Sequence, residues 1–125
     1  MTNTFQNILA WQKAHELVLL IYEITKSFPK NEISGLISQF QRAAVSIPAN
    51  IAEGYKRLSS TEKLRFYNIA QGSLEECRYY MILSYDLKYI TKENYDIMAN
   101  KLEETSKMLN SYCYSISKSD YSKQL

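Results

Sequence analysis

Apolar residues recur every three or four positions through four long stretches of the chain, which is the spacing of one buried face of an α-helix. Polar residues fill most of the positions between them, so each stretch has an apolar face and a polar face. The pattern predicts an all-α protein whose helices cover residues 10–28, 32–57, 60–88 and 92–117.

Residue types at the breaks between these stretches support the helix limits. Pro29 disfavours helical backbone at the residue before it, so the first helix ends there, and Asn31 is suited to cap the second. Ser59 lies three residues before Glu62, which is the pattern of a capping box at a helix start. Thr91 is placed to cap the fourth helix.

The order of these helices predicts the topology. Pro48 falls inside the second stretch, but the apolar repeat keeps its phase on both sides, so we expect one continuous, kinked helix. The connections are only a few residues long, so helices that follow each other run antiparallel. The expected architecture is one domain over residues 1–125, an up-down-up-down four-helix bundle with a polar tail at 118–125 that frays.

Composition supports the helical prediction and excludes several classes of protein. Three glycines and two prolines in 125 residues are too few for the turns of a β-rich fold. No apolar run approaches the length of a membrane span, and a net charge of +2 does not by itself require a polyanionic partner. With two cysteines and no leader segment at its start, the chain is expected to be a reduced, cytoplasmic protein.

Residues for catalysis or metal binding are scarce. His15 is the only histidine and is expected at the surface or at the margin of the core, and no serine lies in a nucleophile motif. Cys77 and Cys113 are out of register across the turn between the last two helices, so we expect two free thiols, with Cys77 buried. The sequence predicts a non-enzymatic protein without a metal or another cofactor.

The first and third helices carry more apolar side chains than one core stripe needs. Residues 17–22 are apolar nearly all the way round the helix, and a second apolar row runs beside the core row of the third helix. Large exposed apolar surfaces mark sites of protein contact. We therefore predict self-association through a face that includes Leu19, Leu20, Phe66, Ile69, Tyr80 and Leu83. The alternative is that the tyrosines lie at the core margin with their hydroxyl groups in water.

The second helix also has a polar row, whose members share one face because they are three and four residues apart: Gln39, Arg42, Ser46, Asn50, Glu53 and Arg57. If the following turn is centred near Leu58 and Ser59, Arg42 lies opposite Glu75. This register predicts a partly buried ion pair of Arg42 with Glu75 or Glu76, which would fix how the two helices align. A fully solvated charged face is the alternative interpretation of the same spacing.

Basic residues gather near the turn between the second and third helices, and they are Lys56, Arg57, Lys63 and Arg65. They are interleaved with aromatic residues and opposed by two glutamates. Cations beside aromatic rings can hold phosphates and stack bases, so these residues and Arg42 are candidate contacts for RNA or DNA. A ring of copies would multiply the small charge of one subunit. The alternative is that charged residues simply collect at helix ends.

Three motifs are long enough to compare with known proteins: AWQKAHEL at residues 10–17, QFQRAAVSIPANIAEG at 39–54 and AQGSLE at 70–75. Together with Phe28-Pro29, they resemble the bacterial four-helix bundle proteins that are encoded within intervening sequences of 23S ribosomal RNA genes. The resemblance covers residues 5–118.

The resemblance implies a homopentameric ring, similar to the accessory variability determinant protein of diversity-generating retroelements, which binds nucleic acid through a basic surface. The family pattern has two arginines before the alanine pair, whereas this chain has Gln41 and Arg42, which leaves one positive charge there. From the resemblance as a whole we expect a homo-oligomer that binds RNA or an RNA–DNA intermediate. The alternative function is a scaffold that binds a reverse transcriptase or another protein without contacting nucleic acid.

Overall fold

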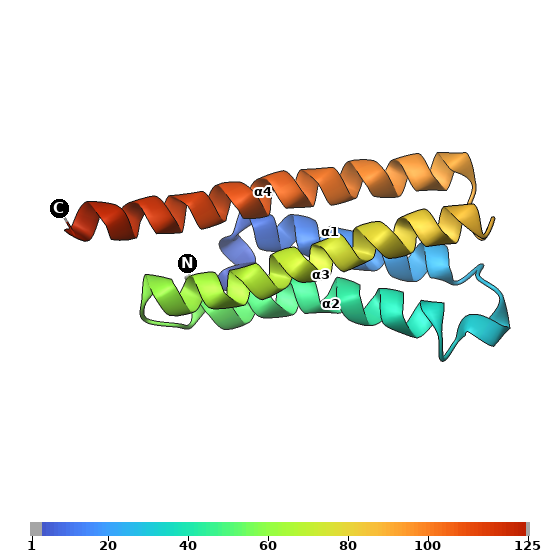
Figure 1. Ribbon diagram of the computed structural model, residues 1–125, viewed down its shortest axis with the longest axis horizontal. Helices are drawn as coiled ribbons and strands as arrows, with labels where there is room; N and C mark the ends of the chain where they lie inside the picture. The colour runs from blue at the N-terminus through green and yellow to red at the C-terminus, as the bar shows by residue number, and fades with distance from the viewer. Residues whose placement is uncertain (1–3, 125) are drawn as a thin grey trace.

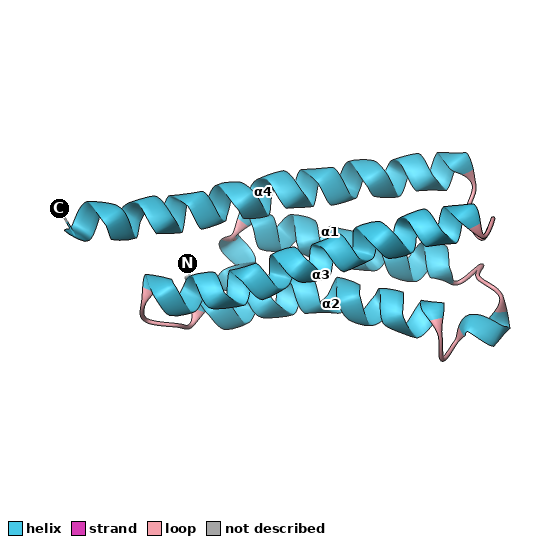
Figure 2. Ribbon diagram, in the orientation of Figure 1, coloured by secondary structure: helices cyan, strands magenta, loops and turns pink. Residues whose placement is uncertain are grey.

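Four helices account for most of the chain. The computed structural model describes residues 4–124, with side chains described through Lys118. The helices are α1 (Leu9–Thr25), α2 (Leu36–Tyr55), α3 (Ser60–Asp86) and α4 (Lys92–Gln124), and the 3₁₀ turns are η1 (Phe5–Asn7) and η2 (Lys30–Glu32). Figure 2 shows helices and loops and no strand in this described part, so the all-α prediction is confirmed.

Each helix runs opposite to the one before it (Figure 1). α1 contacts α2 and α4, and α3 also contacts α2 and α4, so the four helices enclose one core. This arrangement is the predicted up-down-up-down bundle. No helix of the described part is both long enough and apolar enough to cross a membrane.

Apolar side chains at the predicted spacing form the core. The largest fully buried hydrophobic residues are Tyr67, Phe40, Leu17, Ile21, Ile47, Ile51, Leu74, Met98, Leu102 and Leu109. Gly54 permits a close approach of α2 to α3, because a Cβ atom there would lie 2.6 Å from Cε1 of Tyr67. Cys77 is buried and Cys113 is half-buried, both as free thiols, as predicted. Burial raises the pKa of the Cys77 thiol to about 12.

Two of the three helix starts with a predicted local cap have that cap. The side-chain oxygens of Ser59 and Thr91 each accept a hydrogen bond at 3.1 Å from the backbone N–H three residues later. α3 ends at Asp86, two residues before the predicted limit. Lys88 then adopts a left-handed backbone, with φ of 65°, and this conformation turns the chain toward α4.

The connection between α1 and α2 differs from the prediction. α1 ends at Thr25. The backbone N–H groups of the next three residues donate to carbonyls three positions back, and not four as in an α-helix. α2 begins only at Leu36, so Asn31 does not cap it. Instead, Oε1 of Glu32 accepts a hydrogen bond from the Leu36 amide at 3.2 Å, and Oε2 accepts one from the Tyr89 hydroxyl at 2.8 Å. A contact between distant parts of the chain therefore helps to hold this helix start.

α2 is shorter than predicted at both ends, and α4 is longer than predicted. α2 continues through Pro48, as predicted. α4 continues to Gln124, past the predicted limit at residue 117, and no glycine or proline follows Lys92 to end the helix. The fraying of the tail at 118–125 stays a prediction. Figure 1 shows this end of α4 extending past the turn between α2 and α3. Residue 125 lies outside the described residues.

Candidate nucleic-acid interface

The four clustered basic residues lie at the end of the bundle where α2 turns into α3. Lys56 and Arg57 follow the last residue of α2, and Lys63 and Arg65 lie in the first two turns of α3. Because the turn covers only residues 56–59, the two helices bring all four residues to one end of the molecule. This grouping is the one that the sequence predicts.

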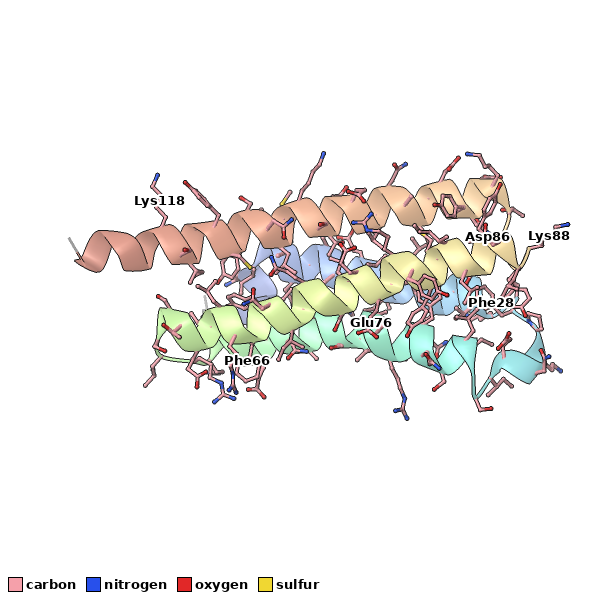
Figure 3. The ribbon with its side chains drawn as sticks, viewed as in Figure 1. Phe28, Phe66, Glu76, Asp86, Lys88 and Lys118 are labelled. Atoms are coloured by element: carbon pink, nitrogen blue, oxygen red, sulfur yellow. The ribbon has the colours of Figure 1, made fainter. Side chains whose placement is uncertain are left out.

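Two of these cations lie over one aromatic ring. The Cζ atom of Arg57 is 4.7 Å from the centroid of the Phe66 ring, and the Cζ atom of Arg65 is 5.3 Å from it. Both distances fall within the range of cation–π attraction. Phe66 is half-buried and lies on α3 close to the turn, where Figure 3 labels it. The ring that the sequence analysis places in a subunit contact therefore lies among the basic residues.

Each of the two guanidinium groups also has a carboxylate partner. Nη2 of Arg57 is 3.2 Å from Oε2 of Glu53, and Nε of Arg65 is 3.4 Å from Oε2 of Glu62. Both pairs are exposed and join residues one helical turn apart, so each contributes little to stability. The carboxylates lower the positive charge that the arginines present to solvent.

The two lysines of the cluster have different surroundings. Nζ of Lys63 donates hydrogen bonds to the backbone oxygens of Tyr55 at 2.8 Å and Gly54 at 3.4 Å, which caps the carboxyl end of α2. Burial lowers the pKa of Lys63. The side chain of Lys56 is exposed and makes no hydrogen bond or ion pair with any residue that the structure describes. Lys63 therefore stabilises a helix end, whereas Lys56 is available to a ligand.

Arg42 lies apart from this cluster, midway along α2. It precedes Lys56 by fourteen residues, counted from 42 to 56, which is about 21 Å along a helix. The predicted ion pair with Glu75 or Glu76 is not formed, since Arg42 is exposed and pairs with no carboxylate among residues 4–118. Glu75 instead pairs with Arg78, whose Nε is 3.1 Å from Oε2.

The register of α2 against α3 also differs from the predicted one. Oγ of Ser73 donates a hydrogen bond to Oγ of Ser46 at 2.8 Å, and the Tyr80 hydroxyl donates one to Oε1 of Gln39 at 3.0 Å. In both pairs the α3 residue is two positions further along the chain than a turn centred between residues 58 and 59 predicts. By the same displacement Arg42 lies opposite Cys77 and not Glu75, and its side chain is exposed.

The rest of the polar row combines a hydrogen-bonded part with an exposed part. Nδ2 of Asn50 donates to the backbone oxygen of Ser46 at 2.8 Å and to its Oγ at 3.0 Å. Arg42 and Glu76 both line a shallow groove of about 280 Å³ between α2 and α3, and Figure 3 labels Glu76 midway along α3. The solvated alternative therefore describes Arg42, whereas Ser46 bonds across to α3 through Ser73, and Asn50 bonds to Ser46 within α2.

Apart from Phe66, the residues predicted to form a subunit contact fall into an exposed group and a half-buried group. Leu19 and Ile69 are exposed, with 57% and 47% of their surface accessible. Leu20, Tyr80 and Leu83 are half-buried and pack against the core of their own subunit. This second group offers a partner less apolar surface than the sequence pattern suggests.

A further apolar surface, between α1 and α2, is not predicted by the sequence analysis. Tyr22, Ile33 and Val45 are exposed there and, with Arg42, line a groove of about 530 Å³. Ile33 lies in the connection before α2, so helical periodicity gives no reason to place it beside the other two. In the sequence, the pattern that indicates this groove is a single apolar residue on a helix face that is otherwise polar.

Two ion pairs between α1 and α4 are also absent from the sequence prediction. Nζ of Lys101 is 2.7 Å from Oε1 of Glu16, and Nζ of Lys13 is 2.9 Å from Oε1 of Glu104. Hydrogen bonds from these lysines lower the pKa of both carboxyl groups. The pairs connect α1 and α4, which are far apart in sequence, so they contribute to the packing of the bundle.

The described residues offer little for metal binding. No three His, Cys, Asp or Glu side chains lie close enough to hold a metal ion in the part of the chain that the structure describes. His15 is exposed, and its ring stacks on Trp11 with a centroid distance of 5.0 Å. Its position matches the expected surface location.

Comparisons with known proteins agree with the fold. The family model of the 23S rRNA-intervening sequence protein matches residues 6–111. A crystal structure of a protein with unknown function from the S23 ribosomal protein family of Bacteroides thetaiotaomicron has a TM-score of 0.75 and 27% sequence identity to this chain. That match covers 84% of this chain and 98% of the other. No curated protein is significantly similar. Since the family model covers most of the sequence, the chain belongs to the 23S rRNA-intervening sequence protein family.

Proposed function

We propose that this protein is a non-enzymatic, homo-oligomeric helical bundle of the cytoplasm that binds RNA or an RNA–DNA intermediate. The observation that carries the proposal is the cluster at Phe66, where the guanidinium groups of Arg57 and Arg65 lie over one ring and the unpaired Lys56 precedes Arg57 in the turn. Cations that share one surface neutralise neighbouring phosphates of a nucleic acid, and phosphate contacts supply most of the non-specific affinity.

The charge at this end of one subunit is small. Its four cations face two carboxylates, Glu53 and Glu62, which leaves an excess of two positive charges. Several copies arranged side by side would present that excess several times to one polyanion, so self-association is part of the proposal. The resemblance to ring-forming bundles leads us to propose a pentamer.

Exposed apolar side chains support self-association. Leu19 and Ile69 remain accessible in the isolated subunit, as do Tyr22, Ile33 and Val45 around the groove between α1 and α2. Light scattering at micromolar concentration tests this part of the proposal. We expect a mass of about five 14.6 kDa subunits, and a stable single subunit would refute it.

Nucleic-acid binding is tested by fluorescence anisotropy with a labelled RNA hairpin and an RNA–DNA duplex. We expect affinity at low salt that falls steeply as salt increases. Changing Lys56, Arg57, Lys63 and Arg65 together to glutamine should abolish binding. The matched control changes four exposed lysines elsewhere, Lys26, Lys30, Lys88 and Lys107, to glutamine and should retain most of the affinity. Absence of low-salt binding, or binding that survives the first set of changes, would refute the proposal.

Arg42 is expected to add a contact only for longer ligands, because it lies about 21 Å along α2 from Lys56. Arg42→Gln should therefore weaken the binding of a long RNA and leave that of a short oligonucleotide unchanged. An equal loss for both lengths would contradict the proposed role of Arg42 in the interface.

The apolar groove between α1 and α2 favours a second candidate function, a scaffold for a protein partner such as a reverse transcriptase. The groove places apolar side chains around the exposed Arg42, a combination common at protein interfaces. Binding to a purified reverse transcriptase that persists after nuclease treatment and is lost on Val45→Asp would favour this function over direct nucleic-acid contact.

A further inference from the structure

Phe66 is the one aromatic ring among the described residues with two guanidinium groups over it. Arg57 reaches the ring from the end of α2, and Arg65 reaches it from α3, at 4.7 Å and 5.3 Å from the centroid. The distance between the two Cζ atoms is therefore at most the sum of these two distances. The ring is thus the contact that brings arginines from two different elements into one small area.

An arginine fixed in this way is prepared to bind phosphate. A free arginine samples many rotamers, and restricting them is part of the cost of binding. The flat face of a guanidinium group stacks on an aromatic ring, whereas its N–H groups point outward in the plane and remain able to donate to phosphate oxygens. Nη2 of Arg57 and Nε of Arg65 face Glu53 and Glu62, and the exposed fractions of the two side chains, 41% for Arg57 and 68% for Arg65, leave their other donors accessible.

We propose that Phe66 is the positioning residue that holds Arg57 and Arg65 as a two-guanidinium clamp for the phosphate backbone of a nucleic acid. The inference rests on the proposed function and adds which chemical part of the ligand the site recognises. Both guanidinium groups lie over the ring and compete with a base for stacking on it, so we expect the clamp to bind phosphates and not to distinguish bases.

Two substitutions at Phe66 test this role by anisotropy titration of labelled twelve-nucleotide strands. Phe66→Leu removes the ring and keeps an apolar side chain, whereas Phe66→Tyr keeps the ring. We expect Phe66→Leu to weaken binding about fivefold to thirtyfold, since each exposed cation–π contact is worth about two- to fivefold. The dependence of affinity on salt should not change, because no cation is removed. Phe66→Tyr should remain within about twofold of the wild type.

A second pair of ligands separates a phosphate clamp from a base-stacking site. An oligouridine strand and an abasic strand of the same length carry the same phosphates, so the clamp should bind both with equal affinity. Weaker binding of the abasic strand would show that bases stack at the site and would overturn the inference. Unchanged affinity of Phe66→Leu would also overturn it.

Failure of this inference is distinguishable from failure of the proposed function. If the wild type binds neither strand at low salt, both are wrong. If the wild type binds and Phe66→Leu binds equally well, only the positioning role is wrong. Circular dichroism checks that each variant is folded, and light scattering checks its subunit number. A change of subunit number in Phe66→Leu would place the ring in a subunit contact and overturn the clamp.

Discussion

Replacing Gly54 with alanine tests the close packing of α2 against α3. The added Cβ atom would lie 2.6 Å from Cε1 of Tyr67, 3.1 Å from Cδ1 of the same ring and 3.2 Å from the backbone oxygen of Lys63. The Tyr67 ring is fully buried, so it cannot turn away without displacing other core residues. The Lys63 carbonyl belongs to the first turn of α3 and moves only with that helix.

The expected loss of stability follows from two opposing effects. Overpacking a core costs about 1–3 kcal/mol, and a contact as short as 2.6 Å argues for the upper half of that range. Alanine favours a helix interior over glycine by about 1 kcal/mol, which offsets part of the cost. Gly54→Ala should therefore lower the free energy of unfolding by about 1–2 kcal/mol and the melting temperature by several degrees.

Gly72 provides the matched control, because a Cβ atom there would meet nothing within 4 Å. It lies inside α3 on the exposed side, so Gly72→Ala should raise the free energy of unfolding by about 0.5–1 kcal/mol. Urea denaturation followed by circular dichroism measures both variants at one fixed subunit concentration, since association changes apparent stability. A Gly54→Ala protein as stable as the wild type would refute the reasoning.

Three other changes have defined outcomes. Replacing Glu53 and Glu62 with glutamine should tighten nucleic-acid binding about threefold at low salt, because two competing carboxylates are removed; unchanged affinity in an anisotropy titration would contradict this. Tyr67→Phe should raise the free energy of unfolding by up to about 1 kcal/mol, because the buried hydroxyl has no hydrogen-bond partner among the described residues; a loss of stability in urea would be the opposite result. The stability contributed by Glu16 and Glu104, whose pKa values are lowered by hydrogen bonds to lysines, should be present above the ordinary pKa of about 4.3 and lost as pH falls through the lower folded values. Glu16→Gln should flatten this acid decline in a pH series of unfolding curves, and an unaltered decline would exclude that contribution.

Helix number, order and direction are predictable from the sequence because they depend on local patterns. The caps at Ser59 and Thr91 depend on residues three positions apart, and the structure has both. The start of α2 was not predictable in this way, since Glu32 bonds to the distant Tyr89. The prediction therefore fails at Asn31, where a tertiary contact outweighs the local preference.

The candidate site was predictable in its position but not in its contacts. A short turn necessarily brings Lys56, Arg57, Lys63 and Arg65 to one end of the bundle. The sequence could not show that two arginines share the Phe66 ring, because this depends on which rotamers the packed helices allow. The observed register of α2 against α3 differs by two residues from the predicted one, so the sequence could not give the neighbours of Arg42 on α3.

The side chain of Glu32 acts on two connections at once. One oxygen holds the beginning of α2, and the other holds the link between α3 and α4, 57 residues away. At this end of the molecule one carboxylate bonds to both connections, whereas Arg57 and Arg65 lie at the opposite end, beside the turn between α2 and α3. A change at position 32 would remove both hydrogen bonds together, whereas the exposed pairs of Arg57 and Arg65 at the other end can change with little effect on the architecture.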